Sequence, residues 1–137
     1  MIINVHGGHS LKCRGASGLL DEVNEDRKVK NKVIELLRAK GHIVYDCTDD
    51  VGKDQNSNLR NIVKKCNAHT VNLDMSIHLN GGKGTGTEVY VINKDSAAKP
   101  HADRIANDIA NALGIRNRGV KTKNLYVLRK AKAPALL

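Results

Sequence analysis

The sequence has very few aromatic residues. It contains three tyrosines and no phenylalanine or tryptophan among its 137 residues. Proteins that hold single-stranded nucleic acid often stack the bases on a row of aromatic side chains. Three tyrosines scattered along the chain do not make such a row, so the composition argues against this class of nucleic-acid-binding protein.

Cysteines and long apolar runs are also scarce. The cysteines are odd in number and include no C-x-x-C pair, which argues against a secreted disulfide framework; they are Cys13, Cys47 and Cys66. No apolar run approaches the roughly 20 residues that cross a bilayer, so no membrane partner is expected. The N-terminus shows no cationic leader, which predicts synthesis in the cytoplasm without a signal peptide. We therefore expect one domain, residues 1–137, with reduced thiols.

Acidic residues are missing from the C-terminal part of the chain. The formal net charge is +9, and from residue 109 onward there are seven basic residues and no acidic one. The other 16 lysines and arginines oppose all 14 acids. Most of the positive field therefore belongs to this region, which could attract DNA, RNA or an anionic wall polymer, because long-range attraction does not select among polyanions.

The apolar periodicity predicts strands that alternate with helices. The first helix is expected over residues 24–40, with Asn24 as its N-cap and Gly41 as its stop. Further helices are expected over residues 59–66 and 100–113, and strands over 1–5, 42–47, 73–79, 87–92, near 120, over 125–128 and from 133. This alternation predicts a single α/β domain with a twisted, mostly parallel (mixed) sheet and helices on both faces.

Histidines and acids at the ends of these elements are candidates for a metal site. A hydrolytic zinc site needs about three nitrogen or carboxylate ligands and a position left for water. His9 follows the first strand, His78 lies at the polar end of another, and Glu25 opens the first helix. Strand ends are the usual place for a site in an α/β sheet. Taken singly, each residue also has an ordinary structural explanation, such as a turn or a favourable charge at a helix N-terminus.

Other residues compete for these roles. His6 is expected to be structural or to support a ligand through a hydrogen bond. Glu22 is the nearest rival of Glu25, and Cys13 is close enough in sequence to be a thiolate ligand. The remaining histidines are expected at the surface or at helix ends: His42, His69 and His101. The glycine-rich residues 80–86 lack the Gly-Lys-Ser/Thr ending of a phosphate loop and precede a strand, so they predict a turn.

Four motifs together resemble a known family. They are Gly-His followed six residues later by Gly-Ala (residues 8–9 and 15–16), a glutamate that opens a long helix (Glu25), Ser-Ile-His-x-Asn (76–80) and Gly-x-Glu-Val-Tyr (86–90). In this order and spacing the chain resembles the zinc-dependent N-acetylmuramoyl-L-alanine amidases of the Amidase_3 type, found in autolysins and phage endolysins. The resemblance covers essentially the whole chain.

The resemblance implies a ligand set, a substrate and a reaction. One Zn²⁺ ion would be held by His9, Glu25 and His78, with Glu22 fitting the pattern less well, and Asn80 would contact substrate. The substrate would be bacterial peptidoglycan, cleaved at the amide between the lactyl group of N-acetylmuramic acid and L-alanine. Zinc polarises the carbonyl and lowers the pKa of water toward roughly 7. An endolysin reaches the wall through a holin or on lysis, which agrees with a missing signal peptide.

The resemblance also implies a departure at the C-terminus. The family places its proton-transferring glutamate on the last core strand, just after a segment similar to residues 133–137, and this sequence stops at Leu137. We therefore expect the last core strand and closing helix to be missing, turnover to fall by about 10²- to 10⁴-fold, and the exposed edge to favour self-association. Glu88 is the acid that could substitute, although a structural role in the turn is favoured.

Two other function classes stay open. The basic C-terminal region and the expected loss of the glutamate also suit a non-catalytic module that binds the cell wall. A basic α/β domain that binds nucleic acid is the third possibility, and it predicts salt-sensitive affinity that survives alanine at His9 and His78.

Overall fold

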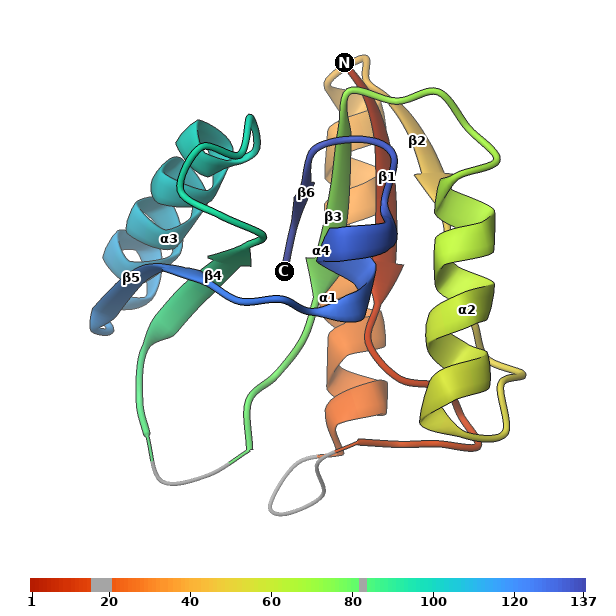
Figure 1. Ribbon diagram of the computed structural model, residues 1–137. Coiled ribbons are helices and arrows are strands. Elements are labelled where there is room, and N and C mark those ends of the chain that lie inside the picture. The colour runs from red at the N-terminus through yellow and green to blue at the C-terminus, as the bar shows by residue number, and fades with distance from the viewer. Residues whose placement is uncertain (16–20, 82–83) are drawn as a thin grey trace.

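The sheet is built mostly from parallel strands (Figure 1). The computed structural model describes residues 1–15, 21–81 and 84–137. Four strands pair in the order β2-β1-β3-β6, and β4 pairs with β5. Their bounds are β1 Ile2–Gly7, β2 Ile43–Asp46, β3 Leu73–Ile77, β4 Thr87–Val91, β5 Asn117–Thr122 and β6 Ala135–Leu136. The ladders between the named strands are parallel, whereas Leu137, which follows β6, and Tyr90 of β4 exchange both backbone hydrogen bonds, which is the antiparallel pattern. The expected α/β class with a mostly parallel, mixed sheet is therefore confirmed.

The last strand joins the two groups of strands. β6 pairs with β3, with Asp74 opposite Ala135 and Met75 opposite Leu136. Leu137 exchanges two backbone hydrogen bonds with Tyr90 of β4, at N–O distances of 2.7 and 3.0 Å. The strand order is therefore β2-β1-β3-β6-β4-β5. The last core strand, which the sequence analysis expects to be missing, is present as a segment of two residues.

Helices cover both faces of the sheet, as expected (Figure 1). They are α1 Glu22–Ala39, α2 Gln55–Cys66, α3 Lys99–Leu113 and α4 Tyr126–Lys130. One core cluster packs α1 and α3 against the sheet, and a second cluster packs α2 and α4 on the other side. In β1, Ile3 and Val5 belong to the first cluster, which follows from the alternation of side chains along a strand. None of the described helices has the length and apolarity needed to cross a membrane.

Two element predictions are wrong. Residues 125–128 are predicted as a strand, but the chain forms α4 there. Val127 and Leu128 are adjacent and both are buried in the cluster with α2, which a strand would prevent by pointing them to opposite faces. α2 begins at Gln55 rather than near residue 59, because Asp54 and Ser57 form a capping box that satisfies its first turn.

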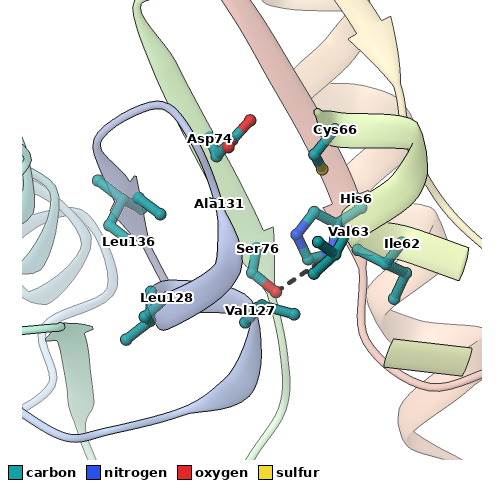
Figure 2. Close-up of a pocket in the computed structure, with 11 residues that line it drawn as sticks. His6, Ile62, Val63, Cys66, Asp74, Ser76, Val127, Leu128, Ala131 and Leu136 are labelled. Atoms are coloured by element: carbon teal, nitrogen blue, oxygen red, sulfur yellow. Dashed lines mark hydrogen bonds between the residues drawn. The ribbon is translucent and has the colours of Figure 1, made fainter. Parts of the chain in front are cut away.

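A row of polar side chains is buried under α2 and α4. Asn4 and His6 of β1 lie beside Asp74 and Ser76 of β3, and all four are at most 6% exposed. Figure 2 shows His6, Asp74 and Ser76 around a small cavity, which has room for about one water molecule. Asn4 donates a hydrogen bond to one carboxylate oxygen of Asp74. The other oxygen, Oδ2, has no partner among the described residues.

This burial gives a testable pH dependence. Burial raises the pKa of Asp74 above its usual range, and the hydrogen bond from Asn4 opposes this only in part. The folded protein therefore binds the proton of Asp74 more tightly than the unfolded chain does. The stability that this proton contributes is complete below the unfolded pKa, near 3.9, and is lost as the pH rises through the folded pKa.

We expect Asp74→Asn to remove this dependence, because the carboxamide does not ionise. The free energy of unfolding of the variant, relative to the original protein, should rise as the pH is raised from 4 to 8 in urea titrations. The exposed Asp103, replaced by asparagine, is the control and should show no such trend. If the difference in the free energy of unfolding between Asp74→Asn and the original protein does not change with pH, this account is contradicted.

Candidate metal centre

Two histidines and a glutamate converge at one edge of the sheet. The Nε2 atom of His9 lies 3.3 Å from one carboxylate oxygen of Glu22, and Nδ1 of His78 lies 3.2 Å from the other. The two imidazoles meet edge to face, with ring centroids 5.4 Å apart. One ligand atom from each of the three residues lies within 4.8 Å of the other two. The arrangement is therefore compact enough to surround a single ion.

The parallel sheet explains why residues so far apart in sequence meet. β1 and β3 are adjacent and parallel, so both end at the same edge. His78 directly follows β3, and His9 follows β1 by two residues. A backbone hydrogen bond of 2.9 Å from Gly8 to Ile77 ties the two strand ends together. Polar residues just beyond the carboxyl ends of neighbouring strands are the usual sites of α/β sheets.

The glycines of the first motif make room for the two imidazoles. A Cβ atom on Gly8 would lie 2.1 Å from Cε1 of His78, and one on Gly15 would lie 2.4 Å from Cδ2 of His9. His9 itself has a left-handed backbone, with φ of 55°. The glycines are therefore packing surfaces for the imidazoles. Ala16, which completes the second pair of this motif, lies outside the described residues.

The structure places Glu22, and not the expected Glu25, between the histidines. Glu22 is 5% exposed, whereas the side chain of Glu25 is 31% exposed and pairs with Lys28 at 2.7 Å. The reason is the start of α1: its N-cap is Asp21, whose side chain accepts from the backbone N–H of Asn24. The expectation that Asn24 caps the helix is therefore wrong.

The sequence contains a signal for the acid that lies between the histidines. The polar residues on the buried side of α1 recur every four positions, at Glu22, Asp26 and Lys30. Spacing of this kind keeps side chains on one face of a helix. Because Asp21 is as good an N-cap as Asn24, extending the helix back to Asp21 would have placed Glu22 on this stripe and Glu25 beside it.

Burial favours the neutral form of the imidazoles of His9 and His6. Burial lowers the pKa of His9, although Glu22 opposes the shift. Burial, with a smaller contribution from His78, lowers the pKa of His6 to about 4. His6 contacts the Ser76 hydroxyl at 3.3 Å and the Gly7 carbonyl at 3.4 Å. A neutral imidazole is the form that binds a metal ion, so the pKa of His9 suits that role.

The other candidates of the sequence analysis lie in different surroundings. His42 contacts the N-terminal amino group, and His69 stacks on Tyr45 with ring centroids 3.7 Å apart. His101 lies in the first turn of α3. Within the described residues, Cys13 is not part of the metal-ligand group and exchanges backbone hydrogen bonds with Ser10.

Glu88 is the centre of an ion-pair network. Its side chain is 7% exposed and pairs with Lys121 and with Arg118, the latter at 3.2 Å. Asn80 and the Tyr90 hydroxyl each donate a hydrogen bond of 2.9 Å to its Oε1. The hydrogen bond from Lys121 is the main reason why the pKa of Glu88 lies below its usual value. A carboxylate held as an anion in this way is a weak proton acceptor, and the network matches the favoured structural role.

An open cleft lies beside the three ligand candidates. Its volume is about 360 Å³, and His9 and His78 line it together with residues of α2 and residues 124–129. Arg129 is the charged residue of this lining, and it donates a hydrogen bond to Asn124 at 2.8 Å. The ligand candidates are therefore accessible to a molecule larger than water.

The donor set fits a zinc ion. Two imidazole nitrogens and one carboxylate oxygen are the ligand types of catalytic zinc sites, which keep a further position open. The adjoining cleft supplies access to such a position. The residues present therefore fit the metal that the sequence resemblance implies.

Known proteins are similar to this chain over its whole length or nearly so. An uncharacterized protein of Clostridium perfringens strain 13 is 39% identical over 100% of this chain and 42% of its own length. The endolysin of Bacillus phage SPP1 is 29% identical over 99% of this chain and 52% of its own. This chain thus spans about two fifths to a half of the length of these relatives.

Solved structures share the fold. The catalytic domain of the CD27L endolysin targeting Clostridia Difficile superimposes with a TM-score of 0.87 at 25% identity, over 100% of this chain and 79% of that chain. The family model described as Amidase_3, N-acetylmuramoyl-L-alanine amidase, matches residues 1–137. The chain therefore belongs to the Amidase_3 family of N-acetylmuramoyl-L-alanine amidases.

Proposed function

We propose that this chain is the metal-binding part of a catalytic domain that hydrolyses peptidoglycan. The bond would be the amide between the lactyl group of N-acetylmuramic acid and L-alanine of the stem peptide. The observation that carries the proposal is the group of His9, Glu22 and His78 in a chain of the Amidase_3 family. Action on the wall after release from the producing cell is part of the same proposal.

The three side chains would have distinct tasks. His9 and His78 offer ring nitrogens, and Glu22 adds a carboxylate between them. Zinc, when bound there, supplies a Lewis acid that polarises the scissile carbonyl and lowers the pKa of water. The packing of each imidazole on a glycine limits its rotation, so the ligand atoms are held in place before the metal arrives.

The cleft supports a substrate that is part sugar and part peptide. Its polar lining includes amide and hydroxyl groups that can hydrogen-bond to a glycan or a peptide; they belong to Gln55, Asn58, Asn124 and Tyr126. Contact of Asn80 with substrate stays a prediction. The lowered pKa of Glu88 argues against this residue as the substitute base.

The test combines metal content with product analysis. The purified chain should bind one equivalent of zinc and, when added to purified cell walls, release new N-terminal L-alanine. His9→Ala should abolish both. If the chain binds zinc and attaches to walls but releases no L-alanine, the result supports the wall-binding alternative. The basic C-terminal region is the feature that favours this alternative. Salt-sensitive DNA binding that persists in His9→Ala would contradict the proposal in favour of a nucleic-acid-binding domain.

A further inference from the structure

A single arginine of α1 is inserted against the turn that carries His9. The side chain of Arg27 is 14% exposed. Its Nη1 atom donates to the backbone carbonyl of Gly8 at 2.9 Å, and its Nη2 atom donates to the carbonyl of His9 at 3.0 Å. The two prongs of one planar guanidinium thus hold two consecutive carbonyls of the turn.

Two carboxylates hold the guanidinium itself. Asp26, which is fully buried, accepts from Nη1 at 2.7 Å, and Asp50 accepts from Nη2 at 2.7 Å. Nε also donates to Asp50, at 3.2 Å. The fixed fork of arginine can serve several acceptors in one plane, which a lysine ammonium cannot reproduce. Arg27 is therefore anchored from α1 and from the loop after β2.

The sequence leaves space for this contact. A Cβ atom on Gly7 would lie 2.1 Å from Nη1 of Arg27. Only a glycine at the end of β1 lets the guanidinium approach the backbone so closely. The first glycine of the sequence Gly-Gly-His thus serves Arg27, and the second serves the ring of His78.

The turn needs external support because of the backbone of His9. Its φ of 55° lies in the left-handed region, which is unfavourable for residues other than glycine and persists where the surroundings hold it. The His9 carbonyl accepts from Arg27 and also from Asn58, the latter at 3.1 Å. Fixing the carbonyls on both sides of the Cα atom fixes the direction in which the imidazole leaves the backbone.

We propose that Arg27 is a positioning residue for the metal centre. It holds the turn of His9 so that the imidazole faces Glu22 and His78 in the absence of metal. The inference rests on the proposed zinc site. It assigns to Arg27, which lies five residues after Glu22 on α1, a role in metal affinity that acts through the turn of His9.

The test measures zinc affinity and ligand geometry in folded variants. Arg27→Lys keeps the charge and loses the fork, and Arg27→Gln loses both. Competition with a chromogenic chelator should show zinc binding weakened by about 10- to 100-fold, the usual effect of losing a residue that supports a ligand. The visible spectrum of the Co²⁺-loaded variants should differ from that of the original protein, because cobalt absorption reports ligand geometry.

Lys30→Met is the matched control. Lys30 is another buried cation of α1, but it pairs with Asp46 at 2.6 Å, and within the described part of the chain no hydrogen bond or ion pair joins it to the turn of His9. This variant is expected to lose stability without a change in zinc affinity or in the cobalt spectrum. Urea unfolding of the metal-free proteins identifies any variant that is not folded.

A second variant keeps the inference testable if Arg27 cannot be replaced. Asp50→Asn leaves Arg27 in place and removes one anchor on an exposed carboxylate, so it should fold and weaken zinc binding by a smaller factor. If the Arg27 and Asp50 variants fold and keep the original zinc affinity and cobalt spectrum, the proposed role of Arg27 is overturned, while the proposed metal site is not. An original protein that binds no zinc would contradict the proposed metal site as well.

Discussion

Glu22→Gln is expected to abolish stoichiometric zinc binding, whereas Glu25→Gln is expected to retain it. Glu22 supplies the carboxylate that faces both imidazoles, at 3.3 and 3.2 Å, and a carboxamide carries no charge to offset that of the metal. The loss of affinity should exceed the 10- to 100-fold that removal of a supporting residue costs. Metal analysis after dialysis and chelator competition measure it.

Glu25→Gln is a well-matched control. It makes the same chemical change one helical turn away, at a carboxylate that pairs with Lys28 near the surface. Both variants should unfold at similar urea concentrations without metal if Glu22 acts mainly through the ion. Loss of zinc in Glu25→Gln with retention in Glu22→Gln would show that the sequence-based choice of ligand is right and the arrangement described above is wrong.

Gly8→Ala is expected to disable the metal centre while leaving all three ligands in the sequence. The added Cβ atom would lie 2.1, 2.3 and 2.7 Å from three atoms of the His78 ring, far closer than non-bonded atoms approach. The ring must therefore leave its position beside Glu22. We expect zinc affinity to fall at least as far as in the Arg27 variants, by about 10- to 100-fold or more, and released L-alanine to fall with it.

The control for this variant is Gly84→Ala. Among the described residues, the new Cβ would meet only the flexible end of Arg118, with Nη1 at 3.1 Å, so zinc binding should not change. Circular dichroism and urea unfolding test whether Gly8→Ala still folds. A folded Gly8→Ala protein with the original zinc affinity would show that His78 is not needed as a ligand in the position described here.

Much of the fold follows from local patterns. The alternation of apolar and polar residues in β3 predicts a strand with one apolar side, and Leu73 is buried in the core as this requires. Gly114, which directly follows the helix predicted over residues 100–113, adopts the left-handed C-cap with φ of 63°. These features depend on neighbours within a few residues, which is why the sequence suffices to predict them.

Other elements depend on contacts that the local sequence does not contain. Val127 and Leu128 have apolar side chains that suit a strand, yet both pack against α2 as part of a helix. The two residues of β6 are held between β3 and β4 by partners about 60 and 45 positions away along the chain. In both cases distant packing outweighs local preference.

By itself, the sequence determined the α/β class and the resemblance that singles out His9 and His78, since both ligands follow strands and sit in short motifs. Only the tertiary structure decided the third residue of the group. Glu22 and Glu25 are three residues apart on α1, a rise of about 4.5 Å, while metal sites tolerate distance errors of only about 0.2 Å. The choice between them therefore depends on where Asp21 starts the helix and on how α1 packs against β1 and β3.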